Sequence, residues 1–168
     1  MFDNNIYRDR RRKLMATLDG GKILMLGNQN SPMNFTHNAY PFVQDSSFLY
    51  YIGVALPNCA CILNIDTEET TFYMNEKTVH DIVWIGKTKP VEHWGERCGA
   101  DNVKPLNDLK KDINNKDKIH FLPQYRVENK FFLQNLLGIE IAKMKTGFSI
   151  PLINQVIAQR SIKSGEEI

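Results

Sequence analysis

Two short apolar runs, separated by four polar residues, constrain the fold of this 168-residue chain more than any other feature. The runs are residues 59–65 and 70–74, and the segment between them reads DTEE. Apolar runs of this length, bounded by polar turn residues, are typical of paired strands. The pattern predicts a β-hairpin at the centre of the chain.

Further strands and helices are expected on both sides of this hairpin. The other expected strands are residues 22–27, 48–53, 102–104, 118–122 and 139–145. The expected helices are residues 3–18, 106–113, 128–137 and about 150–160, and residues 78–85 and 91–98 are helical or irregular. A polar loop fills residues 28–41. This mixed order predicts an α/β layer structure with both hairpins and crossovers.

The composition indicates one ordinary globular domain and excludes several classes of protein. The chain is 42% hydrophobic, which suffices for a core, and its net charge of +2 calls for no nucleic-acid partner. No apolar run reaches the length of a membrane span, and the first residues show no secretory signal. Three cysteines without such a signal favour free thiols in the cytoplasm.

A basic cluster lies on the first expected helix. It consists of Arg8, Arg10, Arg11, Arg12 and Lys13. A nucleic-acid patch would need this charge to continue elsewhere in the chain, and it does not. We therefore interpret the cluster as a solvated helix face.

The segment FVQDSSFLYYIG, residues 42–53, resembles a catalytic site at first sight. It places Asp45, Ser46 and Ser47 directly before a block of aromatic residues. A serine nucleophile needs a positioned base and an oxyanion hole, and the Gly-x-Ser-x-Gly turn is absent. Aspartate and serine are also common in loops and caps. We interpret Asp45 as fixing a loop before a strand with Phe48 and Tyr50 on one face, and predict no catalytic residue.

The sequence also lacks the pattern of a metal or phosphate site. The histidines are His37, His80, His93 and His120, and no two of them have metal-ligand spacing. Cys59 and Cys61 share one face of a strand, but no second pair completes a zinc site. Trp84, followed by cationic residues, fits either a core anchor or a ligand or subunit contact, and the residues alone leave both open.

The last residues have the pattern of a helix start. Ser164 and Glu167 form a capping box, and only Ile168 follows. We therefore expect residues 1–160 to be the front domain of a longer protein and residues 161–168 to be its junction with the next domain.

Three segments together resemble the N-terminal domain of the creatinase, prolidase and aminopeptidase P family. The first is residues 40–53, which match the pattern Y-x-F-x-Q-x-S-x-F-x-Y-x-x-G and are followed by Leu56 and Pro57. The second is Trp84-x-Gly86, with Glu96, Gly99 and Asp101 downstream. The third is residues 160–168, similar to the R-x-x-K-S-x-x-E-I junction before the family's catalytic domain.

The resemblance implies a fold and an activity for the parent protein. The N-terminal domain is α/β, a mixed sheet of about six strands flanked by helices in a ribonuclease H-like arrangement. A second, pita-bread domain holds two divalent metals, manganese or cobalt, through two Asp, two Glu and a His. Metal-activated water then cleaves the bond between an N-terminal residue and a following proline. Those ligands would lie beyond Lys163, so no metal or other cofactor is expected here.

The resemblance also assigns roles to individual residues. The family's N-terminal domain assembles the oligomer, a dimer or tetramer, and shapes the substrate cleft. Trp84, Lys87 and Tyr40 are the expected cleft or subunit contacts. The expected structural residues are Gln44, Asp45, Ser46, Phe48, Tyr50, Gly53, Pro57 and Gly86. Two positions depart from the pattern: Lys87 replaces a frequent Arg, and Leu152-Ile153 replaces a Trp-Arg pair of some members.

We therefore expect the N-terminal domain of a cytoplasmic Xaa-Pro aminopeptidase, inactive alone, whose partners are its own catalytic domain, further copies of itself and proline-containing peptides. Two alternatives stay open: the same domain of a prolidase, which cleaves dipeptides, and an interaction module without catalysis. DNA binding by the first helix is a weaker third alternative.

Overall fold

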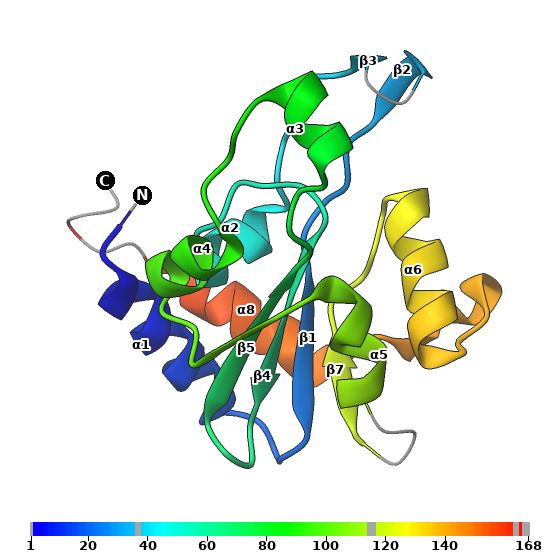
Figure 1. Ribbon diagram of the computed structural model, residues 1–168. Coiled ribbons are helices and arrows are strands. Elements are labelled where there is room, and N and C mark those ends of the chain that lie inside the picture. The colour runs from blue at the N-terminus through cyan, green and yellow to red at the C-terminus, as the bar shows by residue number, and fades with distance from the viewer. Residues whose placement is uncertain (1, 36–37, 114–116, 163–164, 166–168) are drawn as a thin grey trace.

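The centre of the molecule is a mixed five-stranded sheet with the order β6-β5-β4-β1-β7 (Figure 1). The computed structural model describes residues 2–35, 38–113, 117–162 and 165. The strands are β1 (Lys22–Leu26), β4 (Cys59–Asn64), β5 (Glu69–Met74), β6 (Asn102–Lys104) and β7 (Ile119–Phe121). β4 pairs antiparallel with β1 and β5, whereas β7 and β6 add parallel to the two sides. The expected hairpin is confirmed as β4–β5.

Both faces of the sheet are apolar because its strands alternate between two cores. Ile23 and Met25 of β1 lie in the first core, and Leu24 and Leu26 lie in the second. β4 and β5 alternate in the same way, so Cys59 and Cys61 share the first core as expected. A sheet buried on both faces reads as a continuous apolar run, which is why these strands are visible in the sequence.

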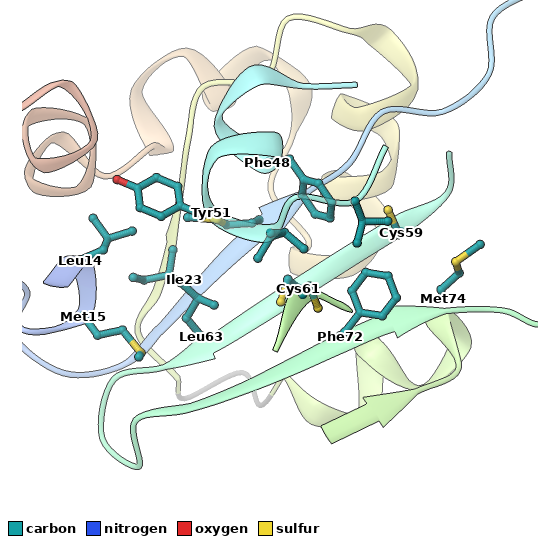
Figure 2. Close-up of a cluster of buried hydrophobic side chains, with 14 of the residues drawn as sticks. Leu14, Met15, Ile23, Phe48, Tyr51, Cys59, Cys61, Leu63, Phe72 and Met74 are labelled. Carbon is teal, nitrogen blue, oxygen red and sulfur yellow. The ribbon is translucent and has the colours of Figure 1, made fainter. Parts of the chain in front are cut away.

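Helices cover each face. The first core is covered by α1 (Asn4–Met15), α2 (Ser46–Ile52), α4 (Val91–Cys98) and α8 (Ile150–Ser161). The second is covered by α5 (Leu109–Asp112), α6 (Val127–Leu137) and α7 (Met144–Gly147), with the short 3₁₀ helices η1 (Leu106–Asp108) and η2 (Ile141–Lys143). Figure 2 shows side chains of the first core, with Phe48 and Tyr51 of α2 lying over the strands. The predicted α/β fold is confirmed.

Two predicted strands are wrong. Residues 48–53 belong to α2, because Asp45 caps a helix there and Gly53 ends it. Residues 139–145 are mostly helical, in η2 and the start of α7. The main sheet therefore has five strands, where about six were expected. The expected capping box at Ser164 to Glu167 lies largely outside the described residues.

The interpretation of the basic cluster as a solvated face is wrong for two of its members. Arg8, Arg12 and Lys13 are exposed, but Arg10 is buried and Arg11 is only 1% exposed. Arg11 donates to the carbonyl oxygens of Tyr51 (3.0 Å), Cys98 (2.8 Å) and Gly99 (2.7 Å). These carbonyls lie at the C-terminal ends of α2 and α4, where the helix dipole stabilises a cation.

A small arm projects past the end of the sheet at which β1 and β5 finish (Figure 1). It consists of α3 (Val79–Ile85) and a two-stranded ribbon, β2 (Pro32–Phe35) with β3 (Asn38–Ala39). The ribbon forms within the stretch expected to be a polar loop. Among the described residues, no helix has the length and apolar character to cross a membrane.

Candidate functional site

The segment around Asp45 is a helix with a cap at each end. The Asp45 carboxylate accepts from the amides of Ser47 (2.9 Å) and Phe48 (2.8 Å), which begins α2. Gly53 ends it in the left-handed conformation, with φ of 73°. A Cβ on Gly53 would lie 2.2 Å from Cζ of Tyr7, so both the backbone and the packing call for glycine here.

Gln44 joins three loops beside this helix. Its Oε1 accepts from the amides of Asn28 (2.6 Å) and Asp45 (3.0 Å). Its Nε2 donates to the carbonyls of Val54 (3.2 Å) and Leu56 (2.8 Å). The side chain is buried, so it satisfies backbone groups that water does not reach. Gln44 therefore fixes the loops on both sides of α2.

The remaining signature residues are packed or lie on the surface, and none forms a nucleophile–base pair. Phe48 is buried, Tyr50 donates from its hydroxyl to the Gln159 carbonyl (3.3 Å), and Pro57 is half-buried before β4. Ser46 is exposed. Ser47 Oγ accepts from Arg160 Nη1 (2.9 Å), and a guanidinium cannot serve as a base.

The thiols offer no reactive or metal-binding group either. Cys59, Cys61 and Cys98 are free and buried. Burial raises the pKa of Cys59 to about 12, and it also raises the pKa of Cys61 and Cys98. Thiols in this state are poor nucleophiles. Within the described part of the chain, no three His, Cys, Asp or Glu side chains are grouped to hold a metal ion.

The expected contact residues lie on the projecting arm. Trp84 on α3 is 61% exposed, and its Nε1 donates to Nε2 of His80 (3.3 Å). Gly86 ends α3, and the next residue, Lys87, is exposed. Tyr40, directly after β3, is 58% exposed. The structure thus settles the environment of Trp84, which is on the surface, and leaves its role as a contact a prediction.

Helix α3 is apolar although it is exposed. Val79 and Val83 are 80% and 75% exposed, and they lie one turn apart. A capping box between Thr78 and Asp81 begins the helix. The helix therefore begins at its own cap, and Val79, Val83 and Trp84 face outward.

A cavity of about 300 Å³ was not foreseen from the sequence. It lies where β1 and β7 end, and it is lined by the start of α2, the segment after β7 and α8. Its polar lining includes Asp45, Ser47 and Arg160. These residues come from two distant parts of the chain, so no local motif announces the cavity.

The comparisons with known proteins agree on one family. The family described as "Aminopeptidase P, N-terminal domain" matches residues 7–120. Human Xaa-Pro dipeptidase is 26% identical over 101 residues, 60% of this chain and 20% of that protein. The mitochondrial intermediate cleaving peptidase 55 of Arabidopsis thaliana is 29% identical over 103 residues, 61% of this chain and 21% of that protein.

A solved structure shows the same fold over nearly the whole chain. Aminopeptidase P from E. coli, solved with the inhibitor Pro-Leu, superposes with a TM-score of 0.79 at 17% identity. The match covers 99% of this chain and 40% of that one, whereas this chain spans about a fifth of the curated relatives named above. The resemblance inferred from the sequence is confirmed: the chain belongs to the family of aminopeptidase P N-terminal domains.

Proposed function

We propose that this chain is the supporting N-terminal domain of a metal-dependent Xaa-Pro aminopeptidase, which removes the N-terminal residue before a proline. The domain has two apolar cores of its own, and among its described residues no three His, Cys, Asp or Glu side chains are grouped to hold a metal ion. In this proposal the bond is cleaved by a further domain. The N-terminal domain supplies assembly contacts and one wall of the substrate cleft.

The observation that carries this proposal is the exposed apolar helix α3. Val79, Val83 and Trp84 place apolar surface on a projecting element. Exposed apolar side chains that gather on one element mark interaction sites, and tryptophan is enriched where binding energy concentrates. Trp84 is therefore proposed to contact the cleft of the same or a neighbouring subunit, and the same role is proposed for Tyr40 and Lys87.

The metals of the family do not fit the described residues of this chain. Two divalent ions need several converging carboxylates and a histidine, and the described part of the chain holds no such group. In this proposal the domain acts through contacts, and no step of the metal chemistry is assigned to its residues.

Hydrolysis tests the proposal. The 168-residue chain and the longer polypeptide that contains it would be incubated with a Xaa-Pro peptide and manganese. We expect cleavage by the longer polypeptide only. Cleavage by the rigorously purified chain would contradict the proposal, and absence of cleavage by both folded proteins would favour an interaction module without catalysis.

A prolidase is the second candidate, and the similarity to human Xaa-Pro dipeptidase favours it. The two enzymes differ in substrate length, so a matched pair of substrates separates them. An aminopeptidase cleaves Ala-Pro-Ala at least as well as Ala-Pro. A prolidase cleaves Ala-Pro and leaves the tripeptide intact.

A further inference from the structure

The cavity at the ends of β1 and β7 occupies a position where α/β folds commonly bind small molecules. β1 and β7 are parallel neighbours. After β1 the chain passes to α2 in the first core, and after β7 it passes to α6 in the second core. When the connections after two adjacent parallel strands run to opposite faces, a crevice opens at their carboxyl ends. The topology therefore creates this space.

The crevice has an apolar wall, and polar groups provide about half of its lining. The residues that provide this wall include Phe48, Leu122, Pro123, Tyr125, Ile153 and Ile157. The volume of about 300 Å³ is at the lower end of the range of small-molecule sites, about 300–1,000 Å³. The space suits a molecule with one aliphatic group rather than a nucleotide or a large cofactor.

Two side chains of opposite charge, Asp45 and Arg160, lie at the polar side of the crevice, and both bind Ser47. Asp45 accepts from the Ser47 amide (2.9 Å), and Arg160 Nη1 donates to the Ser47 hydroxyl (2.9 Å). Both side chains line the crevice. Cζ of Arg160 also lies 5.9 Å from the centre of the Tyr50 ring.

We propose that this crevice binds a free apolar amino acid or a small apolar dipeptide as its zwitterion. The guanidinium of Arg160 receives the carboxylate, for which its planar fork of donors is suited. The carboxylate of Asp45 receives the ammonium group, and the aliphatic side chain packs against Ile153 and Ile157. A charge of each sign beside an apolar wall is complementary to this class of ligand, whereas a simple anion would meet Asp45 and a simple cation would meet Arg160.

Three related probes test which charges the crevice recognises. L-leucine, N-acetyl-L-leucine and L-leucinamide would be titrated into the purified chain and followed by NMR shifts. We expect L-leucine to bind with a dissociation constant on the order of 1 mM or lower, as a ligand of this size allows. Each blocked analogue should bind about tenfold more weakly, because a half-buried charge then lacks its partner. Equal binding of all three, or no binding of L-leucine, overturns the proposal.

Matched variants locate the site. Asp45→Asn keeps a good helix cap and removes the charge. Arg160→Gln keeps a donor for Ser47, and Ile153→Trp fills the crevice. Each should weaken L-leucine binding about tenfold or more, whereas the exposed Arg12→Gln should not. If Arg160→Gln fails to fold, the other two variants decide. Unchanged affinity in the folded variants would exclude this crevice as the site.

The test is independent of the proposed peptidase role. Binding of L-leucine is measured on the chain itself and needs no catalytic domain. Hydrolysis by the longer polypeptide can succeed or fail without changing its outcome.

Discussion

Helices α2 and α3 share one local design and differ in their surroundings. Both have seven residues, both begin at a side-chain cap and both end at a glycine. α2 buries Phe48, Tyr51 and Ile52, whereas α3 exposes Val79, Val83 and Trp84. A seven-residue helix is not stable alone, so α2 depends on the domain beneath it. The family signature around α2 therefore encodes folding, whereas α3 presents Val79, Val83 and Trp84 at the surface.

The largest effect is expected where a buried cation holds the end of α2. Arg11→Met removes a buried donor from the carbonyls of Tyr51, Cys98 and Gly99, of which the Gly99 carbonyl keeps a hydrogen bond from Arg8 Nε (3.0 Å). We expect the free energy of unfolding to fall by about 3–5 kcal/mol, as when one partner of a buried polar pair is removed. Urea denaturation measures this loss.

The neighbouring arginine supplies the control for this prediction. Arg12 is exposed, and its ion-pair partner among the described residues is Asp9 at the surface, so Arg12→Met should change stability by about 0.5 kcal/mol or less. If the two variants were equally stable, the buried hydrogen bonds of Arg11 would contribute nothing to the fold.

Substituting two glycines by alanine separates the cost of backbone strain from the cost of steric crowding. Gly53 and Gly138 both end helices with left-handed backbone, at φ of 73° and 69°. An added Cβ meets Tyr7 at Gly53 and open space at Gly138. Gly138→Ala should cost about 1–2 kcal/mol and Gly53→Ala about 2–4 kcal/mol, because overpacking adds to the strain. Equal losses would show that α2 is not tightly seated on α1.

Removing the N-cap of α2 or α3 should have a smaller effect on stability, and the effect should differ between the two helices. Asp45→Ala should lower the free energy of global unfolding by about 1 kcal/mol, a typical cost of a lost N-cap. Thr78→Ala removes an equivalent cap from a helix that packs little, so its cost is confined to local opening of α3. Hydrogen exchange at α3 should accelerate while the urea midpoint stays unchanged. A shifted midpoint would mean that α3 folds together with the core.

The pH dependence of stability should come from the packed part of the molecule. His120 is buried between Ser149 Oγ (2.8 Å) and the Gly20 carbonyl (3.2 Å), and burial lowers its pKa below the ordinary 6.5. Below pH 6.5 the unfolded chain then binds more protons than the folded chain. The free energy of unfolding therefore decreases as the pH is lowered, until the pH passes below the pKa of His120 in the folded state. Urea midpoints between pH 5 and 8 would show a decline that His120→Gln removes. The same slope in both proteins would assign the decline to other groups.

An element of this structure is predictable from the sequence when the interactions that form it join residues close together in the chain. β4 and β5 are predictable because neighbouring residues alternate between two cores. α2 was predicted as a strand because its aromatic residues favour strands, although Asp45 and Gly53 carry the signals of a helix start and end. In that segment the caps and the tertiary packing outweigh the propensity of the residues between them.

The burial of Arg11 and the crevice could not be predicted from local patterns. The acceptors of Arg11 lie 40, 87 and 88 positions further along the chain. The crevice likewise joins the start of α2 to α8. The exposure of Trp84 is only partly predictable from the sequence. The nearby Gly86 and Lys87 indicate a helix end at the surface, but the residues alone also allow a core position.

The smallest effect on stability is expected at Trp84, where the effect on function should be large. Trp84→Ala removes a side chain that is 61% exposed, so the urea midpoint of the chain should shift by about 0.5 kcal/mol or less. In the longer polypeptide, the same variant should lose about tenfold or more in kcat/KM for a Xaa-Pro peptide, since an exposed tryptophan at a contact contributes about 2 kcal/mol or more. Val79→Ala, on the same helix and more exposed, is the matched control and should lose less. A stability loss as large as that of Gly53→Ala would make Trp84 part of the fold. Full activity with full stability would remove it from the cleft and leave α3 without its proposed role.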